Sequence, residues 1–418
     1  MAYKHGIYTE EVSTIGYLKS KASGTIPVYI GTAPIHTLDS TVNKIATPIL
    51  IQSYADFVKQ LGYSDDWDKF TLCEVAYAHF KNKIHTIAPF VCINIYDPSK
   101  HDNVEGGGES TGINIASITE EDFKAGVDAV DTTTIRCGVT PNIIVAPYFS
   151  ETASYAKLLI KKCTDLIGGK LGCVAYIDIP TSSVSTFAAA KSYKTTNQLT
   201  SKFARLHYPK SKHDGKLFHL SVLDAVATQV VDTETDGVAC HSSSNRKIMC
   251  DVPALNATTE LIYSEGEANE LNAVGITTIN YIGGSFRLWG GHMANYDAAT
   301  IESIEAKDRS DATVRMQIYL DNTIKTDYVE NIDTLLTRRD IDNVISNVSI
   351  WLNSLVNRGY LLKGECKFDD GDNATAELAD GNLVLDVVHT ETPNGKAITF
   401  QMQYDVNGLE TLYSAEEV

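Results

Sequence analysis

Three polar residues have the chemistry that hydrolytic enzymes use: Asp178, Asp224 and His241. An aspartate and a histidine can join a serine in a nucleophilic triad. Asp178 also ends an apolar run, and strand ends are where α/β folds place ligand-binding groups. These residues define one functional hypothesis, an α/β hydrolase or nucleotide-dependent enzyme with its site near Asp178.

The sequence around these residues does not support a catalytic centre. No Gly-x-Ser-x-Gly elbow is present, and the residues after His241, Ser242 to Asn245, predict a loop. Cys240 and His241 are adjacent, so their side chains point in different directions and form a thiolate–imidazole pair poorly. Asp178 is explained more simply as a cap for the turn that follows it. We therefore predict no catalytic residue and no cofactor.

Metal binding is also not expected. The eight cysteines are scattered through mostly apolar segments, and no two have the spacing of a zinc site. This usage is typical of reduced core thiols in a protein made in a cytoplasm. The cysteines are Cys73, Cys92, Cys137, Cys163, Cys173, Cys240, Cys250 and Cys366.

Charge and hydropathy exclude several classes of partner. The net charge of −18 over 418 residues disfavours nucleic acid, which needs a basic face, and anionic membrane surfaces. No apolar run reaches the roughly 20 residues that span a bilayer. Residues 1–11 lack the basic-then-apolar layout of a secretion signal. We expect neither nucleic-acid binding nor direct membrane binding.

Most of the chain alternates between strand and helix patterns. Short apolar runs predict buried strands, and the longer stretches between them predict helices, which indicates a mostly parallel sheet covered on both faces. Residues 97–119 interrupt this rhythm and predict a surface loop or small insertion. The strands are expected at 26–31, 49–51, 90–96, 142–147, 172–180 and 203–209, and the helices at 54–61, 70–81, 120–131, 150–167, 184–195 and 220–231.

The C-terminal hundred residues have a different pattern. Apolar residues at three-and-four spacing predict a helix from Asp340 to Arg358, with Gly359 as its stop signal. Alternation predicts a strand with one apolar face, which either completes its own sheet or pairs with a neighbouring molecule. That face consists of Ile398, Phe400, Met402, Tyr404 and Val406.

Several segments together resemble the contractile tail sheath proteins of phages and phage-derived particles such as R-type bacteriocins. One of them is a helix ending in Leu-Asn, then a Gly-Ile turn, then a strand ending in Trp-Gly. Its motif residues here are Asn272, Gly275, Gly283, Trp289 and Gly290. Similar segments occur in the same order along nearly the whole chain, from His5–Glu11 through Val28–Gly31, Pro141–Pro147 and Ile177–Pro180 to the helix before Gly359.

The resemblance implies a fold and a domain arrangement. It implies an α/β domain of subtilisin-like topology without a catalytic triad, over residues 25–296, and a smaller α+β domain over 297–404. Residues 1–24 would form an N-terminal arm and 405–418 the end of a C-terminal arm. Strands from both arms would pair with neighbouring subunits, through Ile7, Tyr8 and Val12 at one end and through the alternating residues 398–406 at the other.

The resemblance also implies a mechanical function. The subunit would polymerise with itself as stacked, sixfold rings around an inner tube, and contraction would drive the tube through a target envelope. Baseplate and tail terminator proteins would be further partners. Such a protein is made in the bacterial host cytoplasm and then carried in a virion tail or tail-like particle. The sequence leaves open whether that particle is a phage, a bacteriocin or another injection system. Helix 340–358 would face the tube through Asp342, Asn343, Ser346, Asn353 and Asn357.

Overall fold

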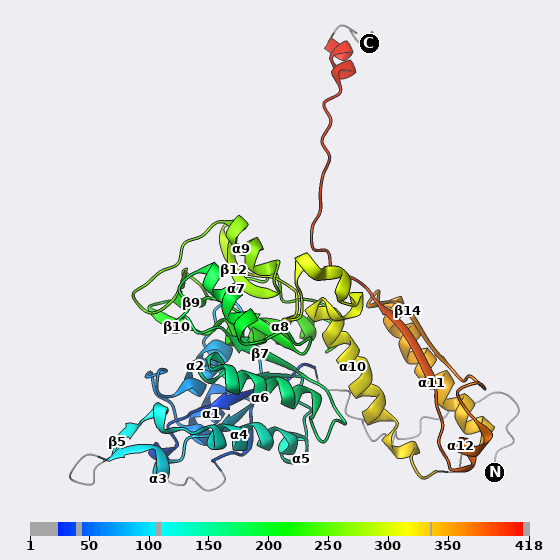
Figure 1. The fold of residues 1–418 in the computed structure, drawn as a ribbon, viewed down its shortest axis with the longest axis horizontal. Coiled ribbons are helices and arrows are strands. Elements are labelled where there is room, and N and C mark those ends of the chain that lie inside the picture. The colour runs from blue at the N-terminus through cyan, green and yellow to red at the C-terminus, as the bar shows by residue number, and fades with distance from the viewer. Residues whose placement is uncertain (1–23, 39–43, 105–109, 335–336, 413–418) are drawn as a thin grey trace, which may run out of the picture.

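The computed structural model describes residues 24–38, 44–104, 110–334 and 337–412 (Figure 1). Its largest element is an eight-stranded sheet in the order β13-β12-β8-β7-β6-β1-β3-β2. The five pairings from β12 to β3 are parallel, and the two outermost strands, β13 and β2, pair antiparallel. The strands are β1 Pro27–Gly31, β2 Pro48–Ile51, β3 Phe90–Asn94, β6 Ile143–Val145, β7 Val174–Asp178, β8 Ala204–His207, β12 Ile276–Ile282 and β13 Ser285–Trp289.

Helices cover both faces of this sheet. Tyr29 of β1 points to one face, where its hydroxyl lies 2.8 Å from Nε2 of His79 on α2, Thr71–Phe80. The next residue, Ile30, packs near Gly126 of α4, Glu120–Ala129, on the other face. Tyr176 of β7 is in register with Tyr29 through β6. It contacts Thr228 of α8, Leu220–Glu234, which places α8 beside α2. Every residue of β1, β3, β6, β7 and β8 is consequently buried, as an apolar strand run predicts.

Six helices of this part lie within a few residues of the predicted ranges, whereas α5, Thr133–Cys137, lies where no helix is predicted. Ser53 caps α1 by accepting a hydrogen bond from the Asp56 amide, as its position before the helix predicts. Thr119 and Asp122 form a capping box on α4. The helices are α1 Tyr54–Leu61, α2 Thr71–Phe80, α4 Glu120–Ala129, α5 Thr133–Cys137, α6 Ala153–Thr164, α7 Phe187–Thr196, α8 Leu220–Glu234 and α9 Glu265–Asn272.

Two small additions lie outside the main sheet. The predicted loop at 97–119 holds α3 Pro98–His101 and an antiparallel pair, β4 Asp102–Val104 and β5 Ser110–Ile113. A three-stranded antiparallel sheet follows β8 and consists of β9 Lys210–His213, β10 Lys216–Phe218 and β11 Val252–Ala254. Neither addition was resolved into these elements by the sequence patterns.

The C-terminal part is built on α10 Asp311–Asp327 and α11 Arg338–Asn357 (Figure 1). The apolar stripe of α11 lies over an antiparallel pair, β14 Leu361–Lys367 and β15 Asp386–Glu391, with α12 Thr375–Ala379 between them in sequence. Thr337 and Asp340 form the capping box of α11, and Gly359 follows it at φ 78°. The predicted helix is therefore confirmed and begins two residues earlier. Residues of α10, α11 and β14 together form the apolar core of the C-terminal part, which includes Met316, Leu320, Val348, Leu352, Leu355, Leu361 and Cys366.

The last described residues run away from the body of the molecule. Figure 1 shows this segment standing clear of the α/β part and ending in a short helix. Residues 392–396 still contact the body: the Thr392 amide donates to the Tyr360 carbonyl, and the Lys396 amino group donates to the Tyr296 hydroxyl at 3.0 Å. Residues 397–405 then run clear of it (Figure 1) and pair with no strand among the described residues. The predicted strand was expected to include Val406, but Val406 begins the 3-10 helix η8, Val406–Leu412. The side chain of Asp405 accepts a hydrogen bond from the Asn407 amide and so ends the extended run.

Two further sequence predictions concern the N-terminal arm and the absence of a membrane-spanning segment. Ile7, Tyr8 and Val12 lie outside the described residues. Among the helices that are described, none has the length and apolar character needed to cross a bilayer.

Candidate functional site

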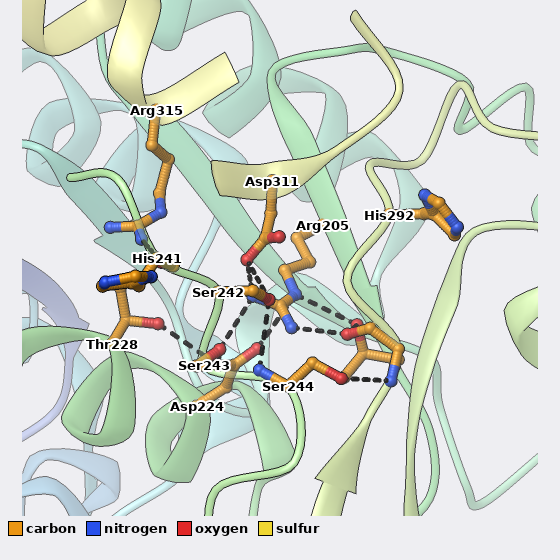
Figure 2. Close-up of polar contacts among 12 residues, drawn as sticks. Arg205, Asp224, Thr228, His241, Ser242, Ser243, Ser244, His292, Asp311 and Arg315 are labelled. Carbon is orange, nitrogen blue, oxygen red and sulfur yellow. Dashed lines mark hydrogen bonds and ion pairs between the residues drawn. The ribbon is translucent and has the colours of Figure 1, made fainter. Parts of the chain in front are cut away.

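The most concentrated polar cluster surrounds the guanidinium of Arg205, which β8 projects from the sheet toward α8 and α10 (Figure 2). Its Nε lies 3.1 Å from Asp224 on α8, and its Nη1 lies 2.6 Å from Asp311 at the start of α10. Further bonds run from Arg205 to the Ser243 hydroxyl and the Gly290 carbonyl. Arg205, Asp224 and Asp311 are fully buried. Because they lie on β8, α8 and α10, their contacts join three separate elements inside the protein.

Charge pairing sets the protonation state of this cluster. Burial alone would raise the pKa of Asp224, but the Arg205 guanidinium and the hydrogen bond from His207 lower it to about 2. For Arg205, burial opposes the charge, and the two carboxylates outweigh it and raise its pKa. Asp224 is therefore ionised at neutral pH as a structural partner of a fixed cation.

The geometry does not assemble the hydrolase site that the three candidate residues suggested. Asp224 contacts His207 at 2.7 Å, and the His241 ring is exposed, with its Nδ1 3.4 Å from the Asn394 side chain. Ser243 donates its hydroxyl to Asp224, so no serine in this cluster is hydrogen-bonded to a histidine base.

The sequence predicts that Asp178 caps the turn that follows it, and the structure corrects this partner: Asp178 caps α8, which is distant in sequence. Its carboxylate accepts hydrogen bonds from the amide and hydroxyl of Ser221, in the first turn of α8. It is buried, and burial raises its pKa above the usual value. The carboxylate thus provides a hydrogen-bond acceptor for the first turn of a buried helix, where backbone N–H groups have no partner within the helix.

Sequence reasoning missed Arg205 and His207. They are two residues apart in a predicted buried strand, so their side chains share one face of it. Two polar side chains on one face of an apolar strand indicate a buried polar cluster, because such groups need partners inside the core. That signal was available, but it does not identify the partners.

A second buried ion pair holds α10 one turn farther along. Both terminal nitrogens of Arg315 contact the two carboxylate oxygens of Asp232 on α8, and Nη2 also donates to the His241 carbonyl at 2.6 Å. Farther along α10, Asn322 exchanges two hydrogen bonds with the backbone of Gly172. α10 is therefore fixed to the α/β part, while its residues Met316 and Leu320 pack in the core of α11.

The motif Asn272–Gly290 proves to be a structural junction. Gly275 has φ 71°, and a β-carbon there would lie 2.4 Å from the Met293 carbonyl oxygen. Gly290 has φ 123°, and a β-carbon would meet the Asn272 side chain at 2.3 Å. In the amide orientation that gives both its nitrogen and its oxygen a partner, the Asn272 nitrogen donates to the Trp289 and Ile276 carbonyls.

The remaining motif glycine, Gly283, forms the two-residue turn of the β12–β13 hairpin. Because the Gly290 carbonyl also accepts from Arg205, the motif links the edge of the sheet to the buried cluster. Positive φ explains the three glycines, with close approach added at Gly275 and Gly290, and hydrogen bonds to the backbone explain Asn272.

Two groups of side chains in the described chain have the composition of a metal site. His213, Asp214 and Asp251 are already joined by hydrogen bonds, and Lys83 lies 3.5 Å from Asp214. Asp369, Asp372 and Asp386 form the second group, at the partly exposed start of β15. The eight cysteines are all unpaired thiols, six of them buried.

The C-terminal segment and α11 carry residues that the sequence predicts to contact other proteins, and these residues are exposed. The predicted face of the segment is exposed along its whole length, with exposed fractions of 80% at Ile398, 83% at Phe400, 96% at Met402 and 74% at Tyr404. All five polar residues predicted on the outer side of α11, Asp342, Asn343, Ser346, Asn353 and Asn357, are also exposed.

Comparison with known proteins identifies proteins of similar sequence and fold. No protein-family model matches the sequence. The chain is 29% identical over 129 residues to the major tail sheath protein of Serratia phage KSP20. This match spans 31% of the chain and 30% of that relative, so the chain matches about a third of the curated relative's length.

Three solved structures are similar over nearly the whole chain. A chain of the anti-feeding prophage baseplate has a TM-score of 0.67 at 13% identity and covers 97% of this chain and 100% of its own. A sheath complex of an extracellular contractile injection system in the contracted state has a TM-score of 0.66 at 16% identity, covering 98% and 99%. A sheath tail protein from Listeria innocua has a TM-score of 0.54 at 10% identity, covering 90% and 97%.

At these identities the structural matches show the fold. The predicted resemblance is confirmed: the chain is similar in sequence to a phage tail sheath protein along 31% of its length, and it has the fold of contractile tail sheath proteins along nearly all of it.

Proposed function

We propose that this chain is the structural, non-enzymatic subunit of a contractile tail sheath. It assembles with copies of itself as a helical stack of rings around an inner tube, and contraction of the stack drives the tube through a target cell envelope. The fold match over nearly the whole chain and the partial sequence match to a tail sheath protein support this function.

The observation that carries the proposal is the C-terminal arm, residues 397–405, which leaves the body after the contact between Lys396 and Tyr296. Four large apolar side chains on one face of this arm are exposed and have no partner in their own chain among the described residues. Ordering a free segment costs roughly 1–2 kcal/mol per residue, and each cross-strand pair contributes only roughly 0.2–1 kcal/mol. Burying each apolar side chain adds about 1.5–3 kcal/mol, so this face is what makes docking favourable.

The acceptor for such a strand is the two-stranded sheet β14–β15. In the described chain each of these strands pairs only with the other, so both outer edges have free backbone groups. One face of this sheet packs on α11, which supports it, but its two edges stay open to added strands. Leu362 and Val388 on these strands are exposed and would gain cover. We therefore assign the sheet to pairing with arms of neighbouring subunits, including the N-terminal residues Ile7, Tyr8 and Val12.

The outer side of α11 is proposed to face the tube. Its exposed residues are mainly uncharged amides and short polar groups, with Asp342 paired to Arg338 at 3.1 Å. Polar contacts of this kind exchange readily with water, because exposed pairs contribute little net free energy. Such a surface can hold the tube before contraction and release it afterwards.

Contraction requires subunits to repack while the arms stay attached. We assign residues 25–296 to an outer α/β domain of subtilisin-like topology and residues 297–404 to the C-terminal domain that forms the arm network. Contacts of this type are heterologous, which builds open stacks and helices. The extended sheath is held kinetically in a packing of higher free energy, and a baseplate signal releases it. Sixfold rings, a baseplate, a tail terminator and an origin in a bacterial host cytoplasm belong to the same proposal.

A truncation tests the arm. We expect a chain ending after Thr399 to remain a folded monomer by circular dichroism and to form no rings or tubes in negative-stain micrographs. The sharper version replaces only the apolar face, as Phe400→Ser with Met402→Ser. The matched control changes the opposite face, as Gln401→Ser with Gln403→Ser, and should assemble normally.

Normal polymers from the truncated chain or from the apolar-face variant would show that the arm does not join subunits. Failure of the control variant to assemble would show that the alternation of side chains does not matter. Either result would contradict the proposed role.

A further inference from the structure

Beyond the extended arm, the chain forms a short apolar ridge. Residues Val406–Leu412 form the 3-10 helix η8, and Val406, Leu409 and Leu412 recur at every third position. A 3-10 helix has three residues per turn, so side chains three apart are eclipsed and lie in one line. The three residues, which we call the terminal ridge, have exposed fractions of 62%, 45% and 75%.

The ridge is separated from the body of its own molecule by the extended arm. Eight residues, 398–405, precede it, and an extended chain spans about 3.3 Å per residue, which places the ridge on the order of 25 Å beyond Ile398. Figure 1 shows the short helix at the far end of this segment, away from every other element. A helical turn of this length is not stable alone in water, so it requires a surface to pack against.

The junction between arm and ridge is a defined turn. The Asp405 side chain accepts a hydrogen bond from the Asn407 amide at 2.9 Å, and the Asp405 carbonyl accepts one from the Gly408 amide at 3.3 Å. These bonds end the strand-like alternation and start the three-residue period. The chain therefore changes from a segment that can pair through its backbone to one that can contact a partner only through side chains.

We infer that the terminal ridge is a second anchoring point of the arm and docks on an apolar surface of a second copy of this chain. The second copy is the partner because the ridge continues directly from the face Ile398–Tyr404, whose docking on a second copy is part of the proposed function. The inference rests on that function but adds a separate contact, made outside the paired sheet.

Site-specific cross-linking separates the two claims. A photo-reactive phenylalanine analogue is placed at Phe400 in one full-length variant and at Leu409 in another. We expect both variants of the assembled protein to give adducts of twice the chain mass. Adducts from position 400 without adducts from position 409 would overturn the ridge contact and leave the function intact. Absence of adducts from both positions would overturn both, and adducts of position 409 only with another protein would overturn the choice of partner.

Substitution measures the strength of the contact. Leu409→Ser with Leu412→Ser leaves the strand-like face unchanged, and we expect the concentration needed for assembly to rise at least about tenfold, since two buried leucines are lost. Ile262→Ser is the control, because Ile262 is 87% exposed and lies outside the arm. Assembly of the double variant at the wild-type concentration would overturn the proposal.

Discussion

Removing the charge of Arg205 tests whether the buried cluster holds the α/β part and α10 together. Arg205→Met keeps a long unbranched side chain and removes the guanidinium. Asp224 and Asp311, which the guanidinium contacts at 3.1 Å and 2.6 Å, would then be buried carboxylates without their cation.

The expected loss is large because all three side chains are fully buried. Removing one partner of a buried ion pair costs about 3–5 kcal/mol, mainly through the unpaired charge that remains. Here two carboxylates lose a partner, so we expect the loss in the free energy of unfolding to reach the upper half of that range. Adding Asp311→Asn should recover part of it, since it removes one unpaired charge.

Urea unfolding of the unassembled chain, followed by circular dichroism, measures this difference. The control is Lys325→Met, which breaks the exposed pair between Lys325 and Asp321 and should cost only about 0.3–0.5 kcal/mol. A loss below about 1 kcal/mol for Arg205→Met, or a double variant less stable than the single one, would refute the reasoning.

Three further predictions follow from the same contacts. Stability from Asp224, whose pKa falls to about 2, should be present above about pH 4 and decline by about 2 kcal/mol as the pH falls to about 2; Asp224→Asn should remove this dependence in urea midpoints measured across that range. Gly275→Ala should lower the thermal midpoint clearly more than Gly283→Ala, because both have positive φ and only Gly275 lacks room for a β-carbon. Leu352→Ala should cost about 2–5 kcal/mol and speed proteolysis around α11, whereas the exposed Ile350→Ala should change neither.

The elements themselves were predictable from local patterns. Apolar runs gave the central strands, three-and-four spacing gave α11, and the alternation at 398–404 gave an extended segment with one apolar face. These features depend on residues within a few positions of one another, and strand and helix geometry fixes which of them share a face. The sequence motifs likewise sufficed to indicate the sheath fold.

The partners of the buried charges were not predictable in this way. The hydrolase hypothesis pairs Asp224 with His241, but the histidine that contacts Asp224 is His207 and the cation is Arg205. Arg205 and Asp311 are 106 positions apart, and no local pattern relates them.

What the sequence alone determined was therefore the periodicity of each element and the apolar face of the C-terminal segment. Tertiary structure decided which charges meet, that α10 is fixed to the α/β part while also packing on α11, and that this apolar face finds no partner among the described residues of its own chain. The physical reason is that a local pattern fixes the direction of a side chain, whereas its partner depends on how distant segments pack.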